Sequence, residues 1–193
     1  MKKILFVGIL SVLFVGASYA QPKIGITAGL NVSNLIESGT YSASNNFKAG
    51  FQAGVVADFG ITENFSIMPE LLFAQRGCKY KDADLNSTLN YLQLPVNAAY
   101  KFDVGYGSKL FIFAGPYIGY AVSGKVGSAD IKFGSADDEM KAFDFGLNVG
   151  VGYEYEKVFF KLQYNPGLIN MSHYTDPSIR NTNIAVSVGY YFN

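Results

Sequence analysis

The stretch FDFGLNVGVGYEY, residues 143–155, alternates between two kinds of side chain at every step. Successive side chains of a β-strand point to opposite faces, so this period of two predicts a strand with two different faces. Phenylalanine, leucine, valine and tyrosine occupy one face, whereas glycine, asparagine and two acids, Asp144 and Glu154, occupy the other. The class of protein depends on which of these faces points inward.

The same alternation recurs along the chain and predicts eight strands. They are expected at residues 23–34, 47–60, 63–76, 88–103, 108–123, 141–155, 157–170 and 182–193. The segment 108–123 has apolar residues in both registers, so the sequence does not assign its faces.

The connections between these segments alternate in length. Short turns are expected near residues 60–64, 103–107 and 154–157, and long polar loops at residues 35–46, 77–87, 124–140 and 171–181. With an even number of up-and-down strands, all short turns lie at one end and all long loops at the other. Bacterial outer-membrane barrels have this arrangement.

The N-terminal residues 1–20 have the features of a secretory signal peptide. Lys2 and Lys3 precede an apolar run, and the small residues Ser18 and Ala20 come just before the expected cleavage site at Gln21. The apolar run is too short for a typical membrane-spanning helix. We therefore expect an exported protein whose residues 21–193 form one domain.

Composition excludes several classes of function. Basic and acidic residues balance at 15 each, so no basic surface for nucleic acid is predicted. Phenylalanine, tyrosine and glycine are abundant while tryptophan is absent, which favours β-structure. The single cysteine, Cys78, has no partner for an internal disulfide, and no cluster of ligating residues predicts a metal or another cofactor.

The polar face indicates the interior of a narrow barrel. It is rich in glycine, serine, asparagine, glutamine and alanine rather than in the lysine and glutamate of a water-exposed sheet, and small residues suit the lumen of eight strands. The apolar face ends in aromatic residues, as at a membrane interface: Tyr100, Phe102, Tyr153, Tyr155, Tyr190 and Phe192. We therefore predict an all-β, eight-stranded antiparallel up-and-down transmembrane β-barrel, in preference to a soluble sandwich or a lipocalin-type barrel.

The charged residues of the polar face are the candidate site. They would point into the lumen, with both signs in similar number: Lys48, Asp58, Glu70, Arg76, Lys101, Asp144, Glu154 and Lys161. Unpaired charge is costly in such a confined space, so these residues should pair. We expect Glu70 to pair with Arg76 or Lys101. A structural network that fills the lumen is the favoured interpretation, and a narrow ion or solute path is the alternative.

Three prolines interrupt consecutive predicted strands at similar heights. Pro69, Pro95 and Pro116 lack the N–H group that a strand ladder uses. A bulge or locally opened hydrogen bonding is therefore expected beside them. The hypothesis is a shared weak seam across the third to fifth strands.

Six motifs in order resemble the strand motifs of the PorT-like family of small outer-membrane β-barrels. They are IGITAGLNVSNL, PELLFAQRG, LNYLQLP, AGPYIGY, DFGLNVGVGYEY and KLQYNPGLIN, and they cover essentially all of residues 21–193. The resemblance implies an eight-stranded barrel in the cell outer membrane. The family's founding example is associated with export of secreted proteins, but most relatives have no assigned role. The near-terminal Phe192 would serve as the signal read by the barrel-assembly machinery.

Taken together, these features predict a monomeric, non-enzymatic scaffold embedded in outer-membrane lipid. Its loops or turns would contact an envelope or extracellular protein. A narrow channel, or a small component of a transport or secretion assembly, is the alternative. A lipid-modifying enzyme is conceivable only through His173, which has Ser172 and Asp176 nearby in the last long loop.

Overall fold

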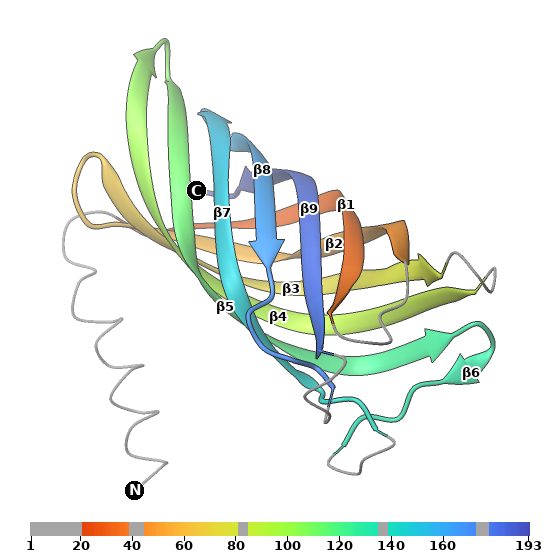
Figure 1. Cartoon of the computed structure of the whole chain (residues 1–193). Coiled ribbons are helices and arrows are strands. Elements are labelled where there is room, and N and C mark those ends of the chain that lie inside the picture. The colour runs from red at the N-terminus through yellow and green to blue at the C-terminus, as the bar shows by residue number, and fades with distance from the viewer. Residues whose placement is uncertain (1–20, 39–44, 81–84, 135–138, 173–177) are drawn as a thin grey trace, which may run out of the picture.

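The computed structural model describes residues 21–38, 45–80, 85–134, 139–172 and 178–193. Eight antiparallel strands close into a barrel in the order β4-β3-β2-β1-β9-β8-β7-β5, and β5 pairs in turn with β4 (Figure 1). The two-residue β6 extends this sheet beside β5. Within the described residues, no helix is long and apolar enough to cross a membrane. The strands are β1 (Lys23–Ser38), β2 (Asn45–Gly60), β3 (Phe65–Tyr80), β4 (Asn86–Gly105), β5 (Ser108–Val126), β6 (Ala129–Asp130), β7 (Phe143–Tyr155), β8 (Val158–Pro166) and β9 (Ser178–Tyr191).

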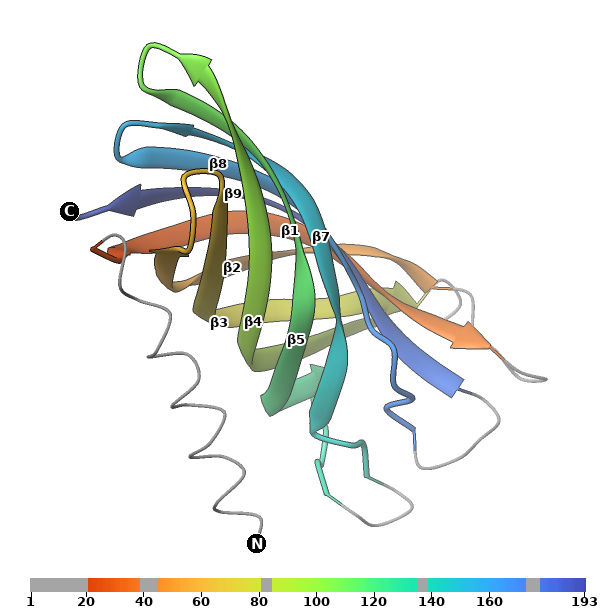
Figure 2. The same ribbon diagram turned by 90° about the vertical axis from the view of Figure 1, so that its left-hand side faces the viewer.

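The short connections lie at one end of the barrel, as their alternating lengths predict. Residues 61–64 join β2 to β3, and two-residue turns join β4 to β5 and β7 to β8. The β4–β5 hairpin projects furthest at this end (Figures 1 and 2). The C-terminal residue also lies here, because the amide of Asn193 donates to the carbonyl oxygen of Pro22 over 2.8 Å. We call this the turn end and the opposite one the loop end.

The strand boundaries differ from the sequence prediction mainly at the loop end. β1, β2, β3, β4, β5 and β9 extend further toward this end than predicted, and β7 begins two residues later than predicted. β8 stops at Pro166, short of the predicted residue 170, because proline lacks the N–H group and Gly167 follows it. Beyond this point β7 and β8 are joined by the isolated bridge between Gly146 and Gly167, and by the Leu168 amide donating to the Phe145 carbonyl oxygen over 2.8 Å.

The two faces of the wall are inverted relative to a water-soluble protein. Large apolar side chains point outward, and Leu30 is 74% exposed. The polar Asp144 and Asn165, in contrast, are 0% exposed and lie inside. A barrel with an apolar exterior and a polar interior is the transmembrane form of this fold.

The faces of β5, which the sequence left open, are set by glycines on its neighbour. Phe111, Phe113 and Tyr117 point inward and are buried. They lie directly opposite Gly152, Gly150 and Gly146 of β7. A Cβ atom at any of these glycines would collide with the opposing ring, and Gly189 stands in the same relation to Phe159. Glycines therefore provide the space that the interior rings occupy.

Strand pairing is interrupted beside all three prolines, without a bulge. β3 and β4 pair as far as Pro69 opposite Val96, and pairing resumes at Leu72 opposite Gln93 in the same register. Between β4 and β5, pairing stops at Pro95 opposite Tyr117 and resumes, again in register, at Ala98 opposite Ala114. Pro69 lies opposite Val96, next to Pro95, and Pro95 lies opposite Tyr117, next to Pro116, so the three prolines lie close together on adjacent strands. On its other side, Pro116 pairs regularly with Leu147 of β7.

Candidate functional site in the barrel interior

The turn-end half of the interior holds a cluster of four charged side chains. Lys101 Nζ lies 2.8 Å from Glu154 Oε2 and also pairs with Asp58. Lys23 Nζ reaches Glu154 Oε1 over 2.5 Å. Lys101, Asp58 and Glu154 are buried, so each charge is held by an opposite one rather than by bulk water.

An apolar layer lies above this cluster. It consists of Val56, Met68, Ala99, Phe111, Phe113, Phe159 and Tyr191. Lys101 Nζ lies 5.8 Å from the centre of the Phe111 ring, and Lys161 Nζ lies 5.9 Å from Phe113 and 5.6 Å from Phe159. The rings therefore pack against ammonium groups as cation–π partners. This layer separates the turn-end cluster from the polar middle of the barrel.

The middle of the barrel is organised around one buried ion pair. Lys161 Nζ lies 2.5 Å and 2.6 Å from the two carboxylate oxygens of Glu70, and the side-chain amide of Asn97 donates to the same carboxylate over 3.3 Å. The predicted pairing of Glu70 with Arg76 or Lys101 is therefore wrong. The sequence does not specify the stagger that brings β3 and β8 side chains together across the lumen.

A second buried pair lies nearer the loop end. Arg76 Nη1 is 3.8 Å from Asp144 Oδ2, and Tyr117 donates to the same carboxylate oxygen over 3.1 Å. The Arg76 guanidinium also donates to Gln93 over 2.9 Å. Asn181 donates to Asp144 over 3.0 Å. This pair is thus embedded in a network of polar side chains from β3, β4, β5, β7 and β9.

A second apolar cluster covers the interior at the loop end. Its buried members are Leu35, Cys78, Leu89, Tyr91, Ala121 and Met171. Cys78 is a free, buried thiol in this cluster. The polar middle therefore lies between two apolar layers.

Lys48 differs from the other seven predicted site residues. It is only half-buried, and its ammonium group donates to the Thr88 hydroxyl rather than to a carboxylate. The other seven are buried and belong to the three ion-pair groups.

The candidate site predicted from the sequence consists of charged residues and leaves out the neutral amides of the interior. Asn165 bonds Asn148, and Asn183 donates to Asn165 over 3.0 Å, so a row of amides crosses β7, β8 and β9. The alternation of the sequence places each of these amides on the inward face, so this pattern could have identified them. Several amide atoms, such as Asn148 Nδ2 and Gln163 Oε1, are buried without a protein partner.

The described interior offers hydrogen bonds and paired charges. Among the residues that the structure describes, no group of three or more His, Cys, Asp or Glu is placed to hold a metal ion. His173 and Asp176 lie outside the described residues.

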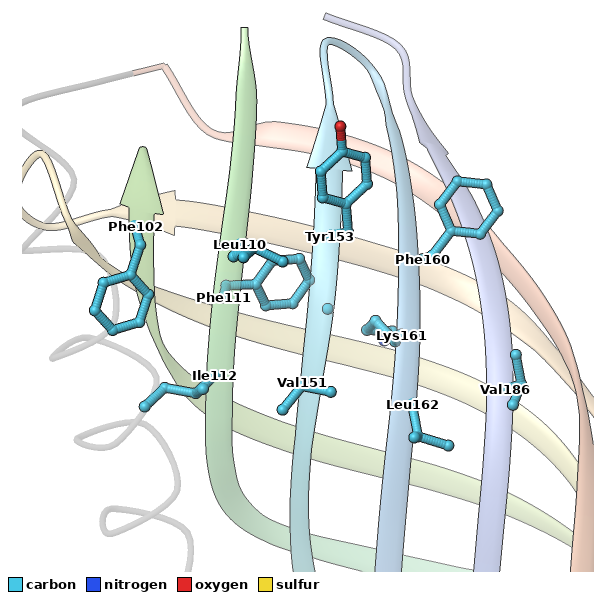
Figure 3. Close-up of a pocket in the computed structure, with 11 residues that line it drawn as sticks. Phe102, Leu110, Phe111, Ile112, Val151, Tyr153, Phe160, Lys161, Leu162 and Val186 are labelled. Carbon is cyan, nitrogen blue, oxygen red and sulfur yellow. The ribbon is translucent and has the colours of Figure 1, made fainter. Parts of the chain in front are cut away.

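The outer wall carries a hollow of about 460 Å³ between two rows of outward side chains (Figure 3). Ile112, Val151 and Leu162 line one side, and Leu110 and Phe160 the other. The hollow is apolar, as expected for a surface in contact with lipid chains.

Comparison with known proteins supports this geometry. A family model described as outer membrane protein beta-barrel domain matches residues 19–173. A search of curated proteins finds no match. Among solved structures, Neisserial surface protein A is 16% identical, with a TM-score of 0.52 over 90% of this chain and 100% of that one.

Two further solved structures share the fold at low identity. The outer membrane protein OprG from Pseudomonas aeruginosa is 12% identical, with a TM-score of 0.53 over 92% of this chain and 99% of that one. The outer membrane enzyme PagL is 13% identical, with a TM-score of 0.53 over 86% of this chain and 98% of that one. At these identities the likeness establishes the fold alone.

Proposed function

Because this chain belongs to the outer membrane protein beta-barrel domain family and lies in the outer membrane, we propose that it is a non-enzymatic scaffold that presents its loops or its turn end to a protein partner. We also propose that it is a PorT-like barrel, a resemblance that bears on its fold and location rather than on its mechanism. The scaffold is a monomer surrounded by lipid, and it reaches the membrane through the barrel-assembly machinery.

The observation that carries the proposal is the filled interior. Two apolar layers enclose a middle in which Glu70 pairs with Lys161 and Arg76 with Asp144. Small barrels are normally filled by side chains in this way. With the lumen filled, the outer wall, the loops and the turn end are the surfaces that can contact a partner.

Single-channel recording tests the closed lumen against the channel alternative. Refolded protein that shows the heat-modifiable gel shift of a folded barrel would be inserted into a planar bilayer. We expect no conductance above that of the empty bilayer. Reproducible steps would instead support a pore, and replacing Phe159 by alanine should then enlarge them, because its ring lies in the apolar layer.

Loop truncation tests the interaction role. Shortening the connection between β6 and β7 should abolish a partner-dependent phenotype while the heat-modifiable shift is kept. Replacing Glu156 and Lys157, the two-residue turn between β7 and β8, by Asn-Gly is the control at the opposite end. If neither change alters the phenotype, the scaffold proposal fails.

The enzyme alternative has its own test. His173→Ala should leave the phenotype and the lipid composition of the outer membrane unchanged. A change in lipid modification in this variant would support a lipid-modifying enzyme and contradict the scaffold.

A further inference from the structure

The turn end of the barrel contains a polar cavity that the scaffold role does not use. Its volume is about 230 Å³, and it lies beneath the turn between β2 and β3. Residues from β1, β2, β3, β4, β5 and the β2–β3 turn contribute to its lining, among them Lys23, Asp58, Glu63, Ser66, Lys101 and Lys109. The cavity adjoins the turn-end ion cluster.

Hydrogen-bond donors are in excess in this cavity. A lysine ammonium has three donors, yet Lys101 uses two, on Asp58 and Glu154, and Lys23 uses one, on Glu154. Lys109 makes no ion pair or hydrogen bond with any residue that the structure describes, although it is only half exposed. Three cationic side chains therefore line the cavity with donors to spare.

A buried hydroxyl adds an independent indication of a ligand. Ser66 is one of the residues that line the cavity, it is 3% exposed, and its buried Oγ has no hydrogen-bond partner among the residues that the structure describes. A buried polar group without a partner is costly, so such groups normally meet protein, water or ligand. Ser66 of β3 and Lys109 of β5 both line the cavity, so one small ligand in it could contact both.

The carboxylates present do not cancel this donor excess. Asp58 and Glu154 are already engaged by Lys101 and Lys23. Glu63, which also lines the cavity, and Asp103, which lies opposite Lys109 on β4, are both exposed to water. Lys109 and Ser66 are therefore the groups whose donors no buried carboxylate engages.

We propose that this cavity binds a small free solute through a carboxylate or phosphate group, with Lys109 and Ser66 as the principal contacts. Charge-assisted hydrogen bonds from ammonium and hydroxyl groups suit such oxygens. The lining consists of inward and turn residues, so the ligand enters from the aqueous phase at the turn end rather than from the lipid around the wall.

A titration followed by NMR tests the proposal. Isotope-labelled barrel in an uncharged detergent would be titrated with inorganic phosphate and, separately, with acetate, at ionic strength held constant by chloride. We expect saturable shifts at the amides of Asn64, Ser66 and Lys109 with at least one of the two anions. Shifts that stay linear with concentration, or that chloride reproduces, would overturn the site.

Matched variants identify the contacts. Lys109→Gln and Ser66→Ala should each weaken binding by about tenfold, the loss expected when one charge-assisted hydrogen bond is removed. Lys157→Gln is the control, because Lys157 is an exposed lysine at the same end that does not line the cavity. Equal weakening in all three variants would show a general effect of positive charge at the turn end rather than a specific site. Unchanged binding in Lys109→Gln and Ser66→Ala would also refute the assignment.

Nanodiscs separate a free solute from a lipid headgroup. In nanodiscs of phosphatidylcholine or of phosphatidylglycerol, both of which carry a phosphodiester, the three amide signals should stay at their positions in uncharged detergent when no phosphate is added. Movement of these signals to the phosphate-saturated positions would assign the cavity to a lipid headgroup and contradict the proposal.

Discussion

The outer wall and the interior of this barrel follow different packing rules. A wall residue such as Val186 needs only to be apolar, because lipid chains surround it and no specific partner residue is required. An interior residue such as Lys161 has a specified neighbour across the lumen, and its replacement affects that neighbour. Wall substitutions should therefore act independently, whereas interior substitutions should be coupled.

The largest expected effect comes from breaking the central ion pair. Lys161→Met leaves the Glu70 carboxylate buried without its cation, and should lower the free energy of unfolding by about 3–5 kcal/mol. Urea unfolding of the refolded protein measures this change.

The coupling of the pair gives the control. Adding Glu70→Gln to Lys161→Met should restore most of the lost stability, because no uncompensated charge remains. Additive losses in the double variant would show that the two residues are not an energetic unit.

A charge on the wall should have the next largest effect. Val186 lies outward between Leu30 and Leu162 on the neighbouring strands, and Val186→Lys should cost about 2–4 kcal/mol if this position is near the middle of the bilayer. Val186→Leu is the matched control, for which we expect little change. Tolerance of the lysine in bilayer unfolding experiments would mean that this face does not contact lipid chains.

The glycine positions opposite aromatic rings should be moderately sensitive. Gly189→Ala places a methyl group against the Phe159 ring and should cost about 1–3 kcal/mol, as overpacking does. Gly119→Ala, also inward, meets its nearest atoms at 3.5 Å and should change stability by less than about 0.5 kcal/mol. If adding Phe159→Leu does not recover the stability lost in Gly189→Ala, the Phe159 ring is not what the added methyl group collides with.

The smallest effect concerns the proline seam. Amides next to the interrupted pairing, such as those of Leu71 and Val96, should exchange with deuterium sooner than those of Ala28 and Leu30, whose pairing with both neighbours is unbroken. Mass spectrometry of the folded protein after brief labelling measures this. Equal protection would show that the missing N–H groups do not loosen the sheet.

The sequence predicts the wall better than the interior because the two depend on different information. Period two is a local property, so it gives the strands, the outward face and the distribution of turns and loops. Which charges meet depends on strand stagger, and Glu70 meets a lysine 91 residues away. The faces of β5 can be assigned only when its aromatic residues are matched with the glycines of β7 that lie opposite them. The early end of β8 follows from Pro166 and Gly167.

Residue-by-residue accessibility along β7 tests the central claim most directly. In a Cys78→Ser background, single cysteines between residues 143 and 155, except at the three glycines that face aromatic rings, would carry a spin label in reconstituted bilayers. Oxygen dissolved in lipid should relax labels at odd positions such as 147, 149 and 151, whereas labels at 144, 148 and 154 should be shielded. The reverse alternation, or none at all, would contradict an apolar face turned toward lipid and a filled polar interior.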